Sequence, residues 1–169
     1  MTLQAALKSQ YHAALAMLGE AITRCPDALW DASTKGNPFW HVAYHALFYT
    51  DLYLEPGEAT YVRWRLHREE YHFMGTVPGP ERRPPRIDRP YAKDEILAYW
   101  RHCDDKVDAA VDRLDLSAPE CGFSWYRMSK LEHQLVNVRH IQHHTAQLID
   151  RLRSATGSGV DWVGGRPVA

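Results

Sequence analysis

Residues 140–148 read His140-Ile-Gln-His143-His144-Thr-Ala-Gln147-Leu148, a run with three imidazoles within five residues. In an α-helix, positions four residues apart lie one turn apart on nearly the same side, so His140 and His144 can point together at one ion. His143 lies about 100° around the helix from His144 and is not expected to join them. Two imidazoles are half a site for a divalent metal, which usually needs three or four protein ligands. The run therefore predicts a metal site completed by another helix or, in the simpler interpretation, a polar helix face rich in histidine.

This run belongs to a long predicted helix, from about residue 130 to 153. Ser129-Lys-Leu-Glu132 matches a capping box, the reciprocal side-chain cap of a helix start. One stripe of the helix is apolar and consists of Leu131, Leu135, Val138, Ile141, Ile149 and Leu152. The other stripe is polar and consists of His133, Asn137, His140, His144, Gln147 and Arg151. Because the polar stripe lies more opposite the apolar one than beside it, it is either solvated or turned to a polar cavity between helices.

Three further helices are predicted at about 2–24, 38–54 and 93–116 from the helical spacing of their apolar residues. Asn37-Pro38 gives the second one an N-cap side chain followed by proline at the first helical position. That helix is apolar nearly all round, which predicts a buried, central position. His45 lies in its middle and needs a partner, because a buried imidazole without one loses its hydrogen bonds to water. The partner is either a metal or a neighbouring tyrosine or aspartate in the core.

Residues 56–92 predict a long Pro/Arg-rich loop. Pro78-Gly79-Pro80 and the run from Arg82 to Arg86 exclude regular structure there. A loop this long in a compact domain is uncommon unless it covers or lines something. Its arginines (Arg82, Arg83 and Arg86) form either a cationic lid over a site or, as is commoner, a solvated crossover. The expected fold is all-α, a four-helix bundle with a long crossover between the second and third helices, in one domain spanning residues 1–169.

Composition narrows the classes of partner. Lys+Arg number 20 and Asp+Glu 21, for a formal net charge of -1, so we expect neither nucleic acid nor a membrane as a partner. No stretch approaches the roughly 20 apolar residues of a membrane span, and residues 1–8 lack the basic and apolar regions of a secretory signal. The three cysteines, Cys25, Cys103 and Cys121, form no CxxC pair, which favours reduced thiols and a cytoplasmic location.

Taken together, these features resemble the DinB-like (DinB/YfiT) superfamily of metal-binding four-helix bundles, and the resemblance covers nearly the whole chain. His140, His144 and Gln147-Leu148 match the family's HxxHHxGQL-like signature, and Tyr44-His45 matches its first ligand position. The resemblance implies that His45, His140 and His144 hold one divalent ion, with a side open to water or substrate.

The chain departs from the family pattern at Thr145 and Ala146, which stand where the family usually has arginine and glycine. His143 is not a usual ligand position in the family. The resemblance assigns it a contact behind the ligands or between helices.

Three neutral imidazoles with an open position can activate water or a thiol, or polarise a carbonyl. Nitrogen ligands suit Zn, Ni, Fe or Co, so they do not select the metal. The resemblance implies a metal-dependent transferase that uses a low-molecular-weight thiol such as mycothiol or bacillithiol, or a related hydrolase. The loop arginines could receive the carboxylates of such a thiol. Asp51 or Gln147 is expected to orient the imidazoles through their other ring nitrogens.

No catalytic residue is identified, because the sequence contains no G-x-S-x-G motif and no glycine-rich phosphate loop. Two other hypotheses stay open. In one, the protein is a stress-related or structural homodimer in which the metal only clamps the second and fourth helices. In the other, no metal binds. A catalytic site should have a cavity beside the ion, whereas a clamp should be closed and four-coordinate.

Overall fold

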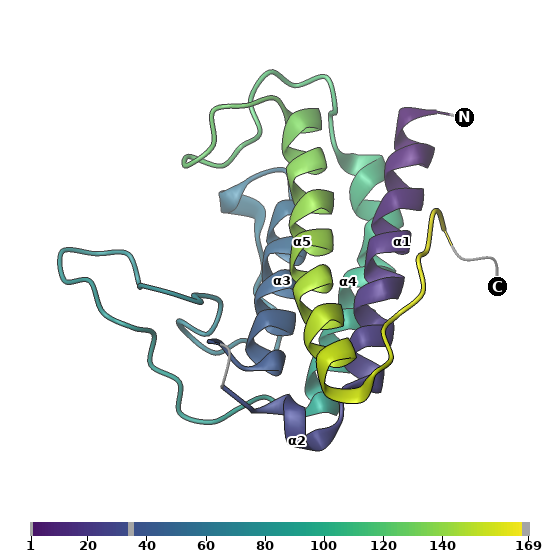
Figure 1. Cartoon of the computed structure of the whole chain (residues 1–169). Helices are drawn as coiled ribbons and strands as arrows, with labels where there is room; N and C mark the ends of the chain where they lie inside the picture. Colours follow the sequence, from purple (N-terminus) through teal and green to yellow (C-terminus); the bar gives the residue numbers. More distant parts are fainter. Residues whose placement is uncertain (1, 34–35, 167–169) are drawn as a thin grey trace.

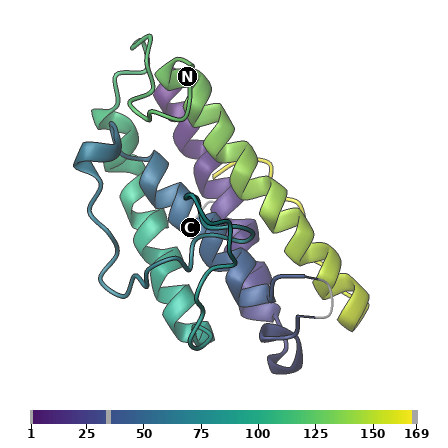
Figure 2. The same cartoon turned by 90° about the vertical axis from the view of Figure 1, so that its left-hand side faces the viewer.

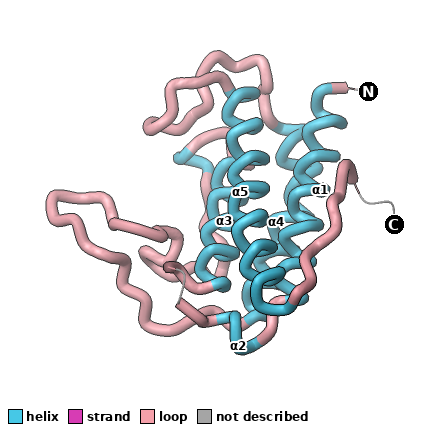
Figure 3. The backbone as a smooth tube through the Cα atoms, in the orientation of Figure 1, coloured by secondary structure: helices cyan, strands magenta, loops and turns pink. Residues whose placement is uncertain are grey.

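The computed structural model describes residues 2–33 and 36–166, so residues 1, 34–35 and 167–169 of the expected 1–169 domain lie outside the described part. Its helices are α1 (Leu3–Arg24), α2 (Asp27–Trp30), α3 (Phe39–Tyr53), the 3₁₀ turn η1 (Glu58–Thr60), α4 (Lys93–Arg113) and α5 (Lys130–Thr156). Figure 1 shows the four long helices side by side, and Figure 3 shows the described chain as helices joined by loops. The all-α class predicted from the sequence is confirmed.

The four long helices form a ring in which α1 and α3 lie diagonally opposite each other. α1 and α3 each pack against both α4 and α5, and have few contacts with each other. Leu47 and Asp51 of α3 contact Cys103 and Lys106 of α4 in the same order, so these two neighbours run in the same direction. Parallel neighbours cannot be joined by a short turn, so the chain returns along the bundle through residues 54–92. Figures 1 and 2 show this segment on one side of the bundle, next to α3.

Several helix ends differ from the sequence expectation. α4 ends at Arg113, whereas α5 continues to Thr156, where Gly157 adopts the left-handed conformation (φ 74°) that favours glycine. Ser129 caps α5 by accepting a hydrogen bond from the Glu132 N–H at 3.2 Å. Asn37 does not cap α3. Its side-chain amide instead donates to the Met74 carbonyl at 2.8 Å, which ties the start of α3 to the long loop.

α5 packs on two sides, against α1 and against α3. His133 and Asn137 of its polar stripe are fully buried, whereas Leu135 of its predicted apolar stripe is 53% exposed. The amides of Gln134 and Asn137 donate to the carbonyls of Tyr53 and Thr50, at 2.9 Å and 3.3 Å. The Tyr53 carbonyl lies in the last turn of α3, where carbonyls lack an intrahelical N–H partner. The Thr50 carbonyl also accepts from the backbone N–H of Leu54 at 3.2 Å. The interpretation of the polar stripe as a solvated face is therefore wrong.

The three cysteines, Cys25, Cys103 and Cys121, are buried and unpaired, as expected for reduced thiols. Among the described residues, no helix combines the length and apolarity needed to cross a membrane.

Candidate metal centre

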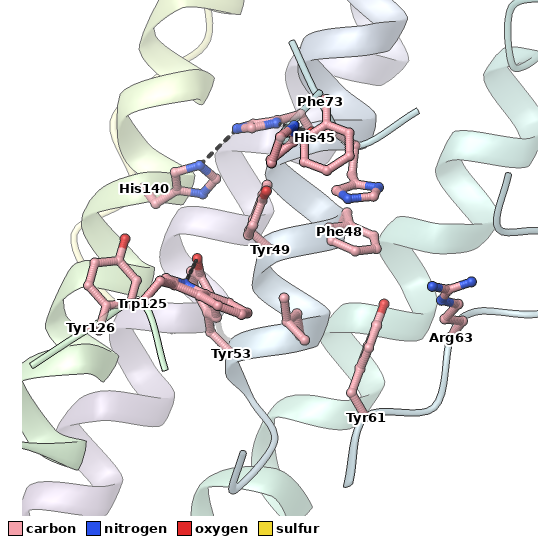
Figure 4. Close-up of a pocket in the computed structure, with 13 residues that line it drawn as sticks. His45, Phe48, Tyr49, Tyr53, Tyr61, Arg63, Phe73, Trp125, Tyr126 and His140 are labelled. Carbon is pink, nitrogen blue, oxygen red and sulfur yellow. Dashed lines mark hydrogen bonds between the residues drawn. The ribbon is translucent and has the colours of Figure 1, made fainter. Parts of the chain in front are cut away.

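α3 and α5 bring His45, His140 and His144 to one point. The Nε2 atom of His140 lies 3.1 Å from Nε2 of His45 and 3.1 Å from Nε2 of His144. The nitrogens that the three residues offer all lie within 4.8 Å of one another, and within the described residues no further histidine, cysteine or carboxylate joins this group. Figure 4 shows His45 and His140 facing each other between the two helices. The three residues implied by the family resemblance thus form one cluster, which could hold a metal ion.

The other ring nitrogens show where the protons lie. His45 Nδ1 is 2.6 Å from the carbonyl oxygen of His72, so Nδ1 carries the proton and donates it. His144 Nδ1 is 2.9 Å from Oε1 of Gln147, and the amide nitrogen of Gln147 is 3.1 Å from Nε2 of His143. That second contact orients the amide with its oxygen towards His144. In the neutral rings of His45 and His144, Nε2 therefore presents a lone pair to the cluster.

His140 cannot satisfy both neighbours. Its Nε2 carries at most one proton and can donate to only one neighbour, so at least one of the two 3.1 Å contacts is not a hydrogen bond. Its Nδ1 is buried and has no hydrogen-bond partner among the described residues. A buried polar atom without a hydrogen-bond partner costs free energy. A proton or a positive ion at the centre of the three Nε2 atoms would remove this cost for the Nε2 atoms.

Protonation does not supply that charge near neutral pH. Burial lowers the pKa of His45 and of His140 to about 3 in each case, and it also lowers the pKa of His144. The three rings are therefore neutral, the form that binds metals. In a tetrahedral site with metal–nitrogen bonds of about 2.0–2.1 Å, ligand nitrogens lie about 3.3 Å apart, close to the spacing seen here. The donor set thus fits a borderline divalent cation.

The partners of the imidazoles were only partly predicted. Gln147 contacts His144, but Asp51 does not reach the cluster, so its predicted orienting role is wrong. Asp51 is fully buried and binds Lys106 at 2.7 Å and the hydroxyl of Tyr99 at 3.0 Å. The partner of His45 is the backbone carbonyl of His72, which no sequence signal marks because every residue carries one.

A pocket of about 640 Å³ opens beside the cluster, and its size suits a small molecule. His45 and His140 form part of its wall, which is completed by Phe48, Tyr49, Leu52, Tyr53, Tyr61, Arg63, His72, Phe73, Pro78, Trp125 and Tyr126. The ring of Tyr49 lies 4.8 Å from that of His45 and 5.5 Å from that of His140. Its hydroxyl makes no hydrogen bond to a described residue. Burial raises the pKa of this hydroxyl, which therefore stays a neutral donor.

The long loop lines this pocket but does not cover it with the predicted arginines. Arg82, Arg83 and Arg86 are absent from the described pocket wall, and Arg83 instead binds Glu70 at 2.8 Å. The cationic-lid hypothesis for these residues is therefore wrong. The arginine at the pocket is Arg63, earlier in the same loop, which the sequence did not distinguish from the others.

Similarity to known proteins is found at the level of a family model. No curated protein and no solved structure matches the chain. The family model of the DinB superfamily matches residues 10–148, a range that includes His45, His140 and His144. The chain therefore belongs to the DinB superfamily.

Proposed function

We propose that this chain is a metal-dependent enzyme in which His45, His140 and His144 hold one divalent transition-metal ion, Zn, Ni, Fe or Co, at the wall of a small-molecule pocket. The observation that supports it best is the position of the cluster. Two of the three histidines line an open pocket, and within the described residues there is no fourth ligand to close the site. Catalytic metal sites keep a position open in this way, whereas structural sites are closed.

The chain's own residues prepare the site. The His72 carbonyl and the Gln147 amide hold the protons of His45 and His144 away from the cluster, so that both Nε2 lone pairs face inwards. A divalent ion bound there would supply Lewis acidity and favour the deprotonated form of water or of a thiol. The Tyr49 hydroxyl is placed to donate a hydrogen bond to a substrate oxygen, and aromatic rings make most of the surrounding wall apolar.

Two reactions suit this arrangement: transfer of a low-molecular-weight thiol to an electrophilic carbon, and hydrolysis of a polarised carbonyl. The thiol transfer is the reaction implied by the family resemblance. In the rival hypothesis the ion only clamps α3 and α5, within a homodimer. The open pocket disfavours the clamp, because a clamp has no need of a cavity beside the ion.

The first test is the metal content of untagged protein by mass spectrometry, with the variants His45→Ala, His144→Ala and His143→Ala. We expect about one equivalent of a transition metal in the wild type and loss of it in the first two variants. His143→Ala should keep the metal but bind it less tightly, because His143 is outside the cluster and only orients Gln147. Arg139→Ala is the matched control, because it changes an exposed side chain next to His140 on the same helix. A wild type that takes up no metal after incubation with zinc and nickel would contradict the proposal.

The second test separates an enzyme from a clamp. Cobalt-loaded protein should change its visible absorption when azide or a small thiol is added, because both bind an open coordination position. Tyr49→Phe should then lower the rate of thiol transfer while leaving the metal content unchanged. An absorption spectrum that ignores both additives would favour the structural homodimer.

A further inference from the structure

The pocket wall has a composition that selects among ligands. Seven of its residues are aromatic: Phe48, Tyr49, Tyr53, Tyr61, Phe73, Trp125 and Tyr126. Trp125 is 51% exposed, and its indole N–H donates to the Tyr53 hydroxyl at 3.3 Å, which fixes the ring while leaving about half of it free. Fixed aromatic faces bind flat, apolar groups by stacking. The body of the ligand is therefore flat and largely apolar.

The charge of the wall points to an anion. Arg63 is the one side chain with a permanent charge among the described residues that line the pocket, and no aspartate, glutamate or lysine accompanies it. Aromatic faces also attract cations, so a ligand with an ammonium group is the natural rival. Such a ligand would meet the guanidinium and the divalent ion of the proposed site, and no carboxylate among the described residues lines this pocket, since Glu69, which binds Arg63, lies outside its wall. An anionic group avoids this repulsion and gains an ion pair instead.

Arg63 is free to make that ion pair. Its guanidinium binds Glu69, but the two side chains are 55% and 69% exposed. An ion pair this exposed contributes little, because water and salt screen it. The guanidinium has five N–H donors, so a ligand carboxylate can displace Glu69 or bind beside it. In Figure 4, Arg63 and His140 lie at opposite sides of the pocket, with Phe48 and Tyr61 also on its wall.

We infer that the ligand of this pocket is a flat, mainly apolar molecule ending in a carboxylate, with the carboxylate at Arg63 and the opposite end beside the three histidines. The orientation towards the histidines rests on the proposed function, whereas the contact with Arg63 does not. The contact can therefore be tested in protein with and without metal.

The test compares three probes with the same body: phenylbutyrate, its amide phenylbutyramide, and phenylbutylamine. Binding to the metal-loaded protein is measured by calorimetry. The carboxylate should bind about tenfold more tightly than the amide, and the amine should bind most weakly. Arg63→Gln should bring the carboxylate to within about threefold of the amide. Arg65→Gln is the matched control, because Arg65 is exposed on the same segment but does not line this pocket.

Three outcomes would overturn the inference: equal binding of the three probes, no binding of phenylbutyrate at millimolar concentration, or a carboxylate preference that survives Arg63→Gln. The last result would mean that the carboxylate binds the ion. Repeating the series without metal separates the two proposals. If the protein takes up no metal, the proposed function fails, but a carboxylate preference that depends on Arg63 should still be measurable.

Discussion

The metal-free protein should lose stability as the pH falls from about 7.5 to about 5, because the histidine cluster resists protonation. Burial lowers the pKa of His45 and of His140 to about 3 in the folded protein. The pKa of a histidine in an unfolded chain is about 6.5. Each histidine therefore takes up its proton more readily in the unfolded state. Its contribution to the free energy of unfolding is complete above about pH 6.5. This contribution is lost as the pH falls towards about 3, which is the pKa of the histidine in the folded protein.

The size of the loss follows from these two pKa values. At about pH 5 both rings stay neutral in the folded protein, while the unfolded chain is about 1.5 pH units below its histidine pKa and has bound both protons. Each pH unit is worth about 1.4 kcal/mol per group. His45 and His140 should therefore cost about 2 kcal/mol each, or about 4 kcal/mol together.

The assay is urea unfolding of the metal-free protein at both pH values, followed by circular dichroism. Other buried histidines titrate in every variant, so the informative quantity is the difference between wild type and His140→Gln. The pH-dependent loss should be smaller by about 2 kcal/mol in His140→Gln. Arg139→Gln is the control, because it changes an exposed side chain next to His140 and removes no histidine. The same pH dependence in wild type and His140→Gln would refute the reasoning.

Three further predictions test the architecture around the cluster. Gln147→Leu should weaken zinc binding about tenfold or more, because one ligand loses the acceptor of its other N–H; competition with a chelator measures this, and an unchanged affinity would contradict it. Gly19→Ala should destabilise the bundle by about 1–3 kcal/mol, because a Cβ there would lie 2.6 Å from the Trp100 ring; an unchanged melting temperature would disprove this packing. Lys106→Met should cost about 3–5 kcal/mol in urea unfolding, because it removes the cationic partner of the fully buried Asp51. A loss below about 1 kcal/mol would show that the remaining partners suffice.

Much of the fold could be predicted because its signals are local. Apolar residues at helical spacing located the four long helices, and prolines and glycines located most of their ends to within a few residues. The pairing of His140 with His144 is equally local, since one helical turn joins them. His45 is 95 residues away from His140, and only the family resemblance connected them.

The remaining features depend on which surfaces meet. The sequence left the polar stripe of α5 either solvated or turned to a cavity, because the angle of a side chain on a helix does not reveal what packs beside it. In the structure, Gln134 and Asn137 donate to the Tyr53 and Thr50 carbonyls at the end of α3. The position of Arg63 at the pocket and the bond from His45 to the His72 carbonyl depend on the path of the long loop, which its composition does not encode.

His144 and His45, whose Nδ1 atoms both have hydrogen-bond partners, are held in different ways. His144 is oriented by Gln147, three residues further along the same helix, whereas His45 is oriented by His72 in the segment 54–92. Local opening of that segment would release the His45 ring and leave the helices packed, since loops open at a lower free energy than a helical core. The residence time of a bound ion would then be set by how often this loop opens. Metal exchange could be fast in a protein whose bundle rarely unfolds.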